Sequence, residues 1–129
     1  MMAYINLKNN TKIYQSGDTT IYANKNITFS IDKGELVIIL GSSGAGKSTL
    51  LNILGGMEPN TSGDVIVAGK NIAKYNAKEL TTYRRNNVGF VFQFYNLIPN
   101  LTAKENVELA AQIVPDAMSA ADALQYVDL

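Results

Sequence analysis

A glycine-rich segment from Gly41 to Thr49 constrains the fold of this chain more than any other part of the sequence. It contains the pattern G-x-x-x-x-G-K-S, follows an apolar run at residues 36–40, and precedes residues 50–54, which we predict to form a helix ending at Gly55-Gly56. A strand, a glycine-rich loop and a helix in this order are typical of a phosphate-binding loop. Its residues are Gly41, Ser42, Ser43, Gly44, Ala45, Gly46, Lys47, Ser48 and Thr49.

The residue types in this loop suit a nucleoside triphosphate. Glycines allow the backbone to curl so that several N–H groups face phosphate oxygens, and the helix N-terminus adds partial positive charge. Lys47 is expected to reach the β- and γ-phosphates, and the Ser48 hydroxyl is expected to ligate Mg²⁺. The alternative is a glycine and serine turn that matches by chance, which the flanking strand and helix patterns disfavour. The sequence therefore predicts binding of a nucleoside triphosphate with Mg²⁺.

Composition narrows the possible classes of function. The 129 residues include 11 basic and 11 acidic side chains, so the formal net charge is zero. Nucleic-acid-binding proteins usually carry a basic excess, so we expect no nucleic-acid partner. The absence of Cys and His excludes disulfides, thiolate zinc sites and histidine-based catalysis within this sequence. No secretion signal and no apolar stretch of about 20 residues is present, so any membrane role is expected to come through a partner.

The remaining patterns predict an α/β fold with an antiparallel β piece. Strands are expected at residues 5–7, 27–31, 36–40, 65–67 and 88–92, with a turn at residues 16–18. Helices are expected after Asn76, Thr102 and Ser119, because each is followed three residues later by an acidic side chain. The helix after Thr102 is expected to cover residues 104–114. Alternation of buried strands with helices indicates the α/β class.

A phosphate loop alone does not distinguish G proteins, nucleotide kinases and transport ATPases. The guanine-reading motif Asn-Lys-x-Asp is missing downstream of the loop. The nearest string, at residues 24–27, lacks the Asp and lies upstream. Paired arginines occur at Arg84-Arg85, where they suit the C-terminal end of a helix better than the lid of a kinase.

The segment after the second buried strand resembles the Q-loop of ATP-binding cassette (ABC) proteins. The strand ends in Gln93, and residues 96–102 form an apolar loop with a proline before a capped helix. Residues 12–14 followed by Gly17 resemble the aromatic A-loop of the family. Further matches lie at residues 32–35, 61–65 and 105–109. The resemblance covers nearly the whole chain and is greatest to cassettes of the macrolide-export and lipoprotein-release type.

The resemblance implies a phosphate-loop ATPase core with parallel strands, an antiparallel β subdomain and the start of a helical subdomain. It implies ATP and Mg²⁺ as cofactors, with Lys47 and Gln93 as catalytic residues and with Ser48 and Gln93 as metal ligands. An amide such as Gln93 can offer its oxygen to Mg²⁺ and its N–H to the attacking water. Tyr14 is expected to stack on adenine, with Tyr22 as the alternative aromatic residue.

The resemblance also implies two protein partners. The apolar run Phe94–Leu101 matches the place where a membrane-spanning subunit docks, although it could instead pack under the next helix. In the complete protein a second cassette would form a homodimer with the first. The implied location is the cytoplasmic face of the cell membrane, reached through the membrane subunit.

Three motifs of the family are missing from this sequence. They are the apolar strand ending in Asp-Glu, the Leu-Ser-Gly-Gly-Gln-type signature and the switch histidine. The resemblance therefore implies a single partial domain over residues 1–129, incomplete at its C-terminus. Its parts are 1–35 with the A-loop, 36–93 from the phosphate loop to the Q-loop, and 94–129. We expect ATP binding and negligible hydrolysis by this chain alone; the alternatives are a non-hydrolysing fragment and a soluble ABC-type ATPase not tied to transport.

Overall fold

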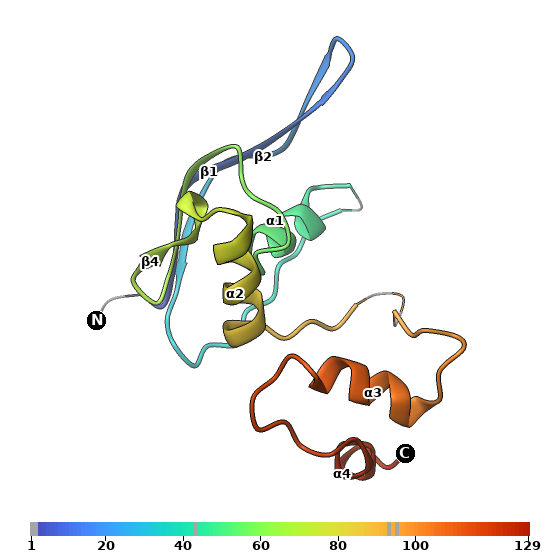
Figure 1. Cartoon of the computed structure of the whole chain (residues 1–129). Coiled ribbons are helices and arrows are strands. Elements are labelled where there is room, and N and C mark those ends of the chain that lie inside the picture. The colour runs from blue at the N-terminus through green and yellow to red at the C-terminus, as the bar shows by residue number, and fades with distance from the viewer. Residues whose placement is uncertain (1–2, 43, 93, 95) are drawn as a thin grey trace. The chain divides into compact units, whose positions relative to one another are not determined.

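The computed structural model describes residues 3–42, 44–92, 94 and 96–129. The chain divides into two compact units, Met1–Arg84 and Arg85–Leu129 (Figure 1). The elements in chain order are β1 (Ile5–Ser16), β2 (Thr19–Ile31), α1 (Lys47–Leu54), β3 (Ser62–Val67), β4 (Lys70–Asn71), a 3₁₀ turn η1 (Ile72–Lys74), α2 (Ala77–Asn87), α3 (Ala103–Ala111) and α4 (Ala120–Tyr126). No helix in the described ranges is long and apolar enough to cross a membrane.

The first unit is built on an antiparallel sheet with the strand order β2-β1-β3-β4. A tight turn joins β1 to β2, with Ser16 opposite Thr19 and Gly17 at φ 60°, a left-handed conformation that favours glycine. Both strands of this hairpin are longer than the predicted strands at residues 5–7 and 27–31. In the sheet, Leu7 lies opposite Val65, and both side chains are fully buried. This pair forms the centre of the core.

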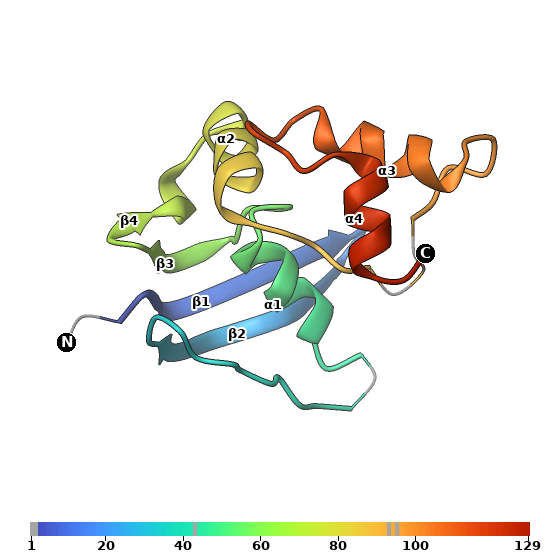
Figure 2. The same cartoon turned by 90° about the horizontal axis from the view of Figure 1, so that it is seen from below.

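Helices α1 and α2 bury one face each in this unit. Figure 2 shows α1 lying across the β1–β2 pair, and its buried side chains are Leu50 and Ile53. The buried Tyr83 of α2 donates its hydroxyl to the carbonyl of Leu54 at 2.7 Å. Burial raises the pKa of Tyr83 to about 12, so its hydroxyl stays protonated as a donor. The C-terminal end of α1 is therefore attached to α2 by a specific polar contact.

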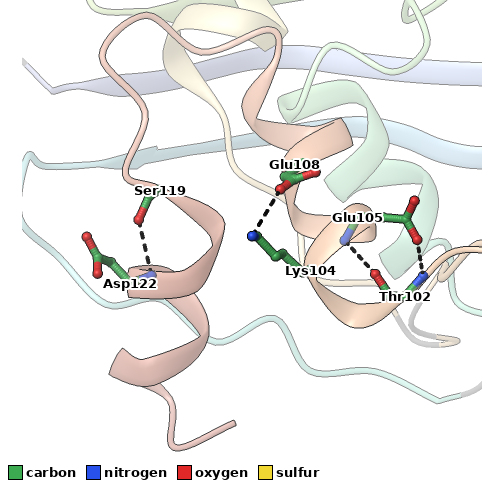
Figure 3. A network of polar contacts seen from close by, with 6 residues as sticks. All are labelled: Thr102, Lys104, Glu105, Glu108, Ser119 and Asp122. Atoms are coloured by element: carbon green, nitrogen blue, oxygen red, sulfur yellow. Dashed lines mark hydrogen bonds and ion pairs between the residues drawn. The ribbon is translucent and has the colours of Figure 1, made fainter.

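The second unit consists of short helices that depend on their caps. Figure 3 shows the capping box between Thr102 and Glu105 and the bond from the Asp122 backbone N–H to the Ser119 hydroxyl. The predicted helix starts are therefore confirmed, including the one at Asn76, which exchanges two hydrogen bonds with Glu79. Helix α3 ends at Ala111 and not at residue 114 as predicted. Pro115 disfavours helical backbone at the residue before it, which contributes to this earlier end.

Two predicted strands are wrong as structural elements. Residues 36–40 have no strand conformation, and Leu36, Ile38 and Leu40 are 94%, 75% and 87% exposed. Residues 88–92 also lack strand conformation, and Val91 is fully exposed. A strand needs a neighbouring strand to pair its N–H and C=O groups. Among the described residues neither segment pairs with another strand, so their hydrophobicity alone does not make them strands.

Candidate functional site

The glycine-rich loop lies against strand β2 through a position that only glycine can occupy. Gly44 and Gly46 have φ values of 79° and 90°, in the left-handed region. Gly46 is the N-cap of α1, and a Cβ there would lie 2.1 Å from the carbonyl oxygen of Ala23. Ser43 lies outside the described residues. The curled loop and the start of the helix follow from glycine at these positions.

Lys47 folds back onto its own loop. Its Nζ donates to the carbonyl oxygens of Gly41 and Ser42 at 2.6 and 2.7 Å. Both acceptors are neutral, whereas a phosphate oxygen carries negative charge and would add Coulombic attraction to the ammonium. A phosphate oxygen would therefore be a better partner for this ammonium. Ser48, the predicted metal ligand, is exposed at the start of the same helix.

The buried side chain of Asn24 supports the helix start from β2. Its Nδ2 donates to the carbonyl of Gly46 at 3.2 Å, and the same carbonyl accepts the first helical bond from the Leu50 N–H at 3.0 Å. Because a trans peptide points its C=O and the following N–H in opposite directions, this arrangement aims the Lys47 N–H out of the helix start. No role was predicted for Asn24, which lay only within the rejected guanine motif at residues 24–27. The structure places Asn24 on β2, and a polar side chain at that position was the one sequence signal of its role.

Tyr14 lies beside the same helix. Its hydroxyl donates to Oε1 of Glu58 at 2.5 Å. This bond, together with partial burial, raises the pKa of Tyr14, while the Thr49 hydroxyl next to it acts in the opposite direction. The residue is 39% exposed, and Nζ of Lys12 lies 5.2 Å from the centroid of the ring. Glu58 was not predicted as a site residue, and Lys12 was noted only within the A-loop resemblance at residues 12–14.

Tyr22, the alternative aromatic residue, is on the other face of the hairpin. It lies opposite Ile13 in the sheet register. Residues opposite one another share a face, and successive residues along a strand alternate between faces. Tyr22 therefore shares the face of Ile13 and not that of Tyr14. Tyr14 is the tyrosine that reaches α1.

The predicted docking loop is in the second unit. Gln93 and Tyr95 lie outside the described residues, so the structure says nothing of the predicted role of Gln93. Phe94 and Leu97 are 79% and 67% exposed. Asn106 of α3 holds the end of the loop, accepting from the Ile98 N–H at 2.8 Å and donating to the carbonyls of Ile98, Leu101 and Thr102.

The donor set limits which metal fits this site. In the part of the chain that the structure describes, no group of three His, Cys, Asp or Glu side chains is arranged to hold a metal ion. Mg²⁺ is commonly bound by one or two protein oxygens together with substrate phosphates and waters. The exposed Ser48 hydroxyl beside the Lys47 ammonium fits this mode of binding.

Comparisons with known proteins identify the family of this chain. Residues 24–129 match the family model described as ABC transporter. The chain is 51% identical over 105 residues to the ABC transporter ATP-binding protein MJ0796 of Methanocaldococcus jannaschii, covering 81% of this chain and 45% of that protein. It is 49% identical over 106 residues to the macrolide export ATP-binding/permease protein MacB of Bradyrhizobium diazoefficiens, covering 82% of this chain and 16% of that protein.

Solved structures show the same likeness. The dimeric post-hydrolysis state of the ATP-binding cassette MJ0796 bound to ADP and Pi matches with a TM-score of 0.87 and 44% identity, covering 97% of this chain and 57% of that chain. The predicted cassette fold is thereby confirmed, although the parallel strands at residues 36–40 and 88–92 are not formed. The chain spans about half or less of the length of these relatives. From its phosphate loop, its fold and its sequence, this chain belongs to the ABC transporter family of ATP-binding cassettes.

Proposed function

We propose that this chain binds Mg·ATP through residues 41–49. The observation that carries the proposal is the arrangement at the start of α1. Gly44 and Gly46 curl the loop, and Lys47 places its ammonium on carbonyls that a phosphate would replace. The N-terminus of α1 adds backbone N–H donors and partial positive charge. MJ0796, whose cassette is seen with ADP and Pi, supports the assignment.

Each predicted site residue has a role in this proposal. Lys47 binds the β- and γ-phosphates, while Ser48 and Gln93 hold Mg²⁺. Bound Mg²⁺ neutralises charge on the phosphate oxygens and orients them. Tyr14 contributes by stacking on adenine, a contact of about 1–3 kcal/mol by analogy with base stacking on aromatic side chains. Because stacking tolerates different bases, ATP and GTP are expected to differ modestly in affinity.

Hydrolysis that powers transport belongs to the complete cassette in this proposal. The sequence lacks the acidic pair that holds the metal and polarises water. Phosphoryl transfer to water requires both a bound metal and a positioned water. We therefore expect negligible phosphate release by this chain alone, so a nucleotide-binding role without hydrolysis is the second candidate. A turnover of order 1 per second, the low end for kinases, would contradict this expectation.

The proposal includes protein partners and a location. A membrane-spanning subunit docks on Phe94–Leu101, where Phe94 and Leu97 are already exposed. MacB is an ATP-binding/permease protein by name, and MJ0796 forms a dimer, so a second cassette completes the assembly. The chain then acts at the cytoplasmic face of the membrane. The division into residues 1–35, 36–93 and 94–129 is part of the same proposal.

Calorimetry with the Lys47→Ala variant tests nucleotide binding. Loss of the ammonium leaves phosphate charge uncompensated, so the affinity for Mg·ATP should fall at least about tenfold, or 1.4 kcal/mol. Lys33→Ala is the matched control, because Lys33 lies in the exposed turn after β2, outside the loop. Equal affinities for the parent and a folded Lys47→Ala variant would overturn the assignment of the phosphate loop.

The docking proposal is tested in a full-length relative that carries the same loop. A charge at position 97 would be buried against the membrane subunit, which is costly. Leu97→Asp should therefore abolish copurification with that subunit while leaving Mg·ATP binding near normal. If the variant still copurifies and its ATPase activity still responds to substrate, the loop only packs on the following helix.

A further inference from the structure

Glu58 makes a long-range contact to the proposed nucleotide site. It follows α1, whereas Tyr14 is on β1, 44 residues earlier in the chain. The Tyr14 hydroxyl donates to its carboxylate at 2.5 Å. A hydrogen bond to an ionised carboxylate is shorter and roughly twice as strong as a neutral one. This bond attaches the tip of the ring to the loop behind α1.

Lys12 fixes the same ring from a second direction. Lys12 is two residues before Tyr14 on β1, and its side chain extends over the Tyr14 ring. Lys12 Nζ donates to the Pro59 carbonyl at 2.7 Å and lies 5.2 Å from the centroid of the Tyr14 ring. Two neighbouring side chains of β1 are thus bound by two consecutive residues, Glu58 and Pro59.

The ring held in this way lies at the phosphate loop. The Thr49 hydroxyl acts to lower the pKa of Tyr14 and so lies near the Tyr14 hydroxyl, and Thr49 is two residues beyond Lys47 in the first turn of α1. The ordinary pKa of a tyrosine lies well above neutral pH and the bond to Glu58 raises that of Tyr14 further, so the hydroxyl is protonated and can donate. With 39% of the residue exposed, ring surface remains available to a ligand.

We propose that Glu58 is a positioning residue of the nucleotide site, which holds the Tyr14 ring, backed by Lys12, in place to stack on the nucleobase. The inference rests on the proposed function and adds residues that determine base binding. A ring already held by a hydrogen bond and a cation loses less conformational freedom when a base stacks on it. The contribution of Glu58 therefore concerns the base and not the phosphates.

Calorimetry with two ligands separates these parts of the affinity. Mg·tripolyphosphate carries the phosphates alone, and Mg·ATP adds the nucleoside. The dissociation constant for Mg·tripolyphosphate divided by that for Mg·ATP therefore measures the nucleoside contribution, and a lower ratio means a smaller contribution. Glu58→Ala and Tyr14→Phe should each lower this ratio about two- to tenfold, the cost of ordering one side chain on binding. The affinity for tripolyphosphate should stay unchanged.

A double variant and a charge control make the test specific. The double variant Glu58→Ala with Tyr14→Phe should lower the ratio no further than either change alone, because each change removes the same hydrogen bond. Glu58→Gln keeps an acceptor oxygen for the Tyr14 hydroxyl. It should therefore lower the ratio less than Glu58→Ala does. Asp18→Ala removes an acidic charge from the hairpin turn and should leave the ratio unchanged.

The outcomes distinguish the inference from the function on which it rests. If the parent prefers Mg·ATP and folded Glu58→Ala and Glu58→Gln keep the full preference, the inference is overturned while the phosphate loop stands. A loss of affinity equal for both ligands would also overturn it, because Glu58 would then act only on the fold. If the parent binds neither ligand, the proposed function fails and the inference fails with it.

Discussion

Strand β1 and the segment at residues 36–40 belong to the same unit, and their behaviour is the reverse of what their hydrophobicity suggests. β1 contains many polar residues, with the sequence INLKNNTKIYQS, yet it is a strand of 12 residues paired on both sides. Residues 36–40 are all Leu, Val or Ile, but they are unpaired and Leu36 is 94% exposed. Pairing, and not apolar content, distinguishes the two regions.

The comparison shows where each region obtains its partners. β1 finds β2 across a two-residue turn and β3 on its other edge. A strand that is apolar along its whole length is typical of the interior of a parallel sheet, which requires neighbours on both sides and cover on both faces. In the part of the chain described by the structure, no strand takes that place beside residues 36–40.

The largest expected difference between the two regions is in core truncation. Leu7→Ala removes a fully buried side chain opposite Val65 and should lower the free energy of unfolding by about 2–5 kcal/mol. Ile38→Ala is the matched change in the unpaired segment, where Ile38 is 75% exposed. This change should alter the free energy of unfolding by less than about 0.5 kcal/mol. Urea unfolding followed by circular dichroism measures both. Similar losses for the two variants would show that residues 36–40 are buried in solution.

A smaller effect is expected from glycines in the paired region. Gly63 of β3 has φ 90°, and a Cβ there would lie 2.3 Å from the carbonyl oxygen of Asn9 on β1. Gly63→Ala should therefore add an overpacking cost of about 1–3 kcal/mol to the backbone strain. Gly69→Ala is the control, because Gly69 has φ 82° with open space around it. An alanine there would have the backbone strain without the overpacking. Equal losses in urea unfolding would mean that β1 and β3 do not approach so closely.

The smallest effect is expected in the second unit, where α3 depends on local bonds. None of the nine residues of α3, all of them described, is buried, so its cap contributes much of its stability. Thr102→Ala should destabilise the helix by about 1 kcal/mol, seen as faster amide exchange in its first turn. Lys104→Ala removes only an exposed ion pair of 3.9 Å and should change exchange little. A larger effect from Lys104→Ala would contradict this view of α3.

The same cap makes α3 sensitive to acid. The Thr102 backbone N–H, followed by the Thr102 hydroxyl, holds the pKa of Glu105 below its ordinary value. A lowered folded pKa contributes stability above the unfolded pKa, and that stability is lost as the pH falls through the folded pKa. The protection factors of the α3 amides, which are the intrinsic exchange rates divided by the observed rates at the same pH, should therefore fall on acidification in the parent. Glu105→Gln should remove this pH dependence.

Features of this protein that depend on near neighbours in sequence were predictable. The caps at Asn76, Thr102 and Ser119 each join residues three positions apart, so their geometry follows from local side-chain chemistry. The hairpin turn at Gly17 and the start of α1 behind a glycine-rich loop are local for the same reason. The curl of the loop at Gly44 and Gly46 was predictable because the glycine pattern is itself a local conformation.

Features that join distant residues were decided only by the tertiary structure. The contact between Tyr14 and Glu58, the support of Gly46 by Asn24, and the choice of Tyr14 over Tyr22 depend on how β1 and β2 pair and on where α1 packs. The conformation of residues 36–40 was also decided by the tertiary structure, because their apolar sequence predicts a strand that does not form. A side chain carries its own hydrophobicity and hydrogen-bonding groups, but whether these are satisfied depends on which distant segment lies beside it.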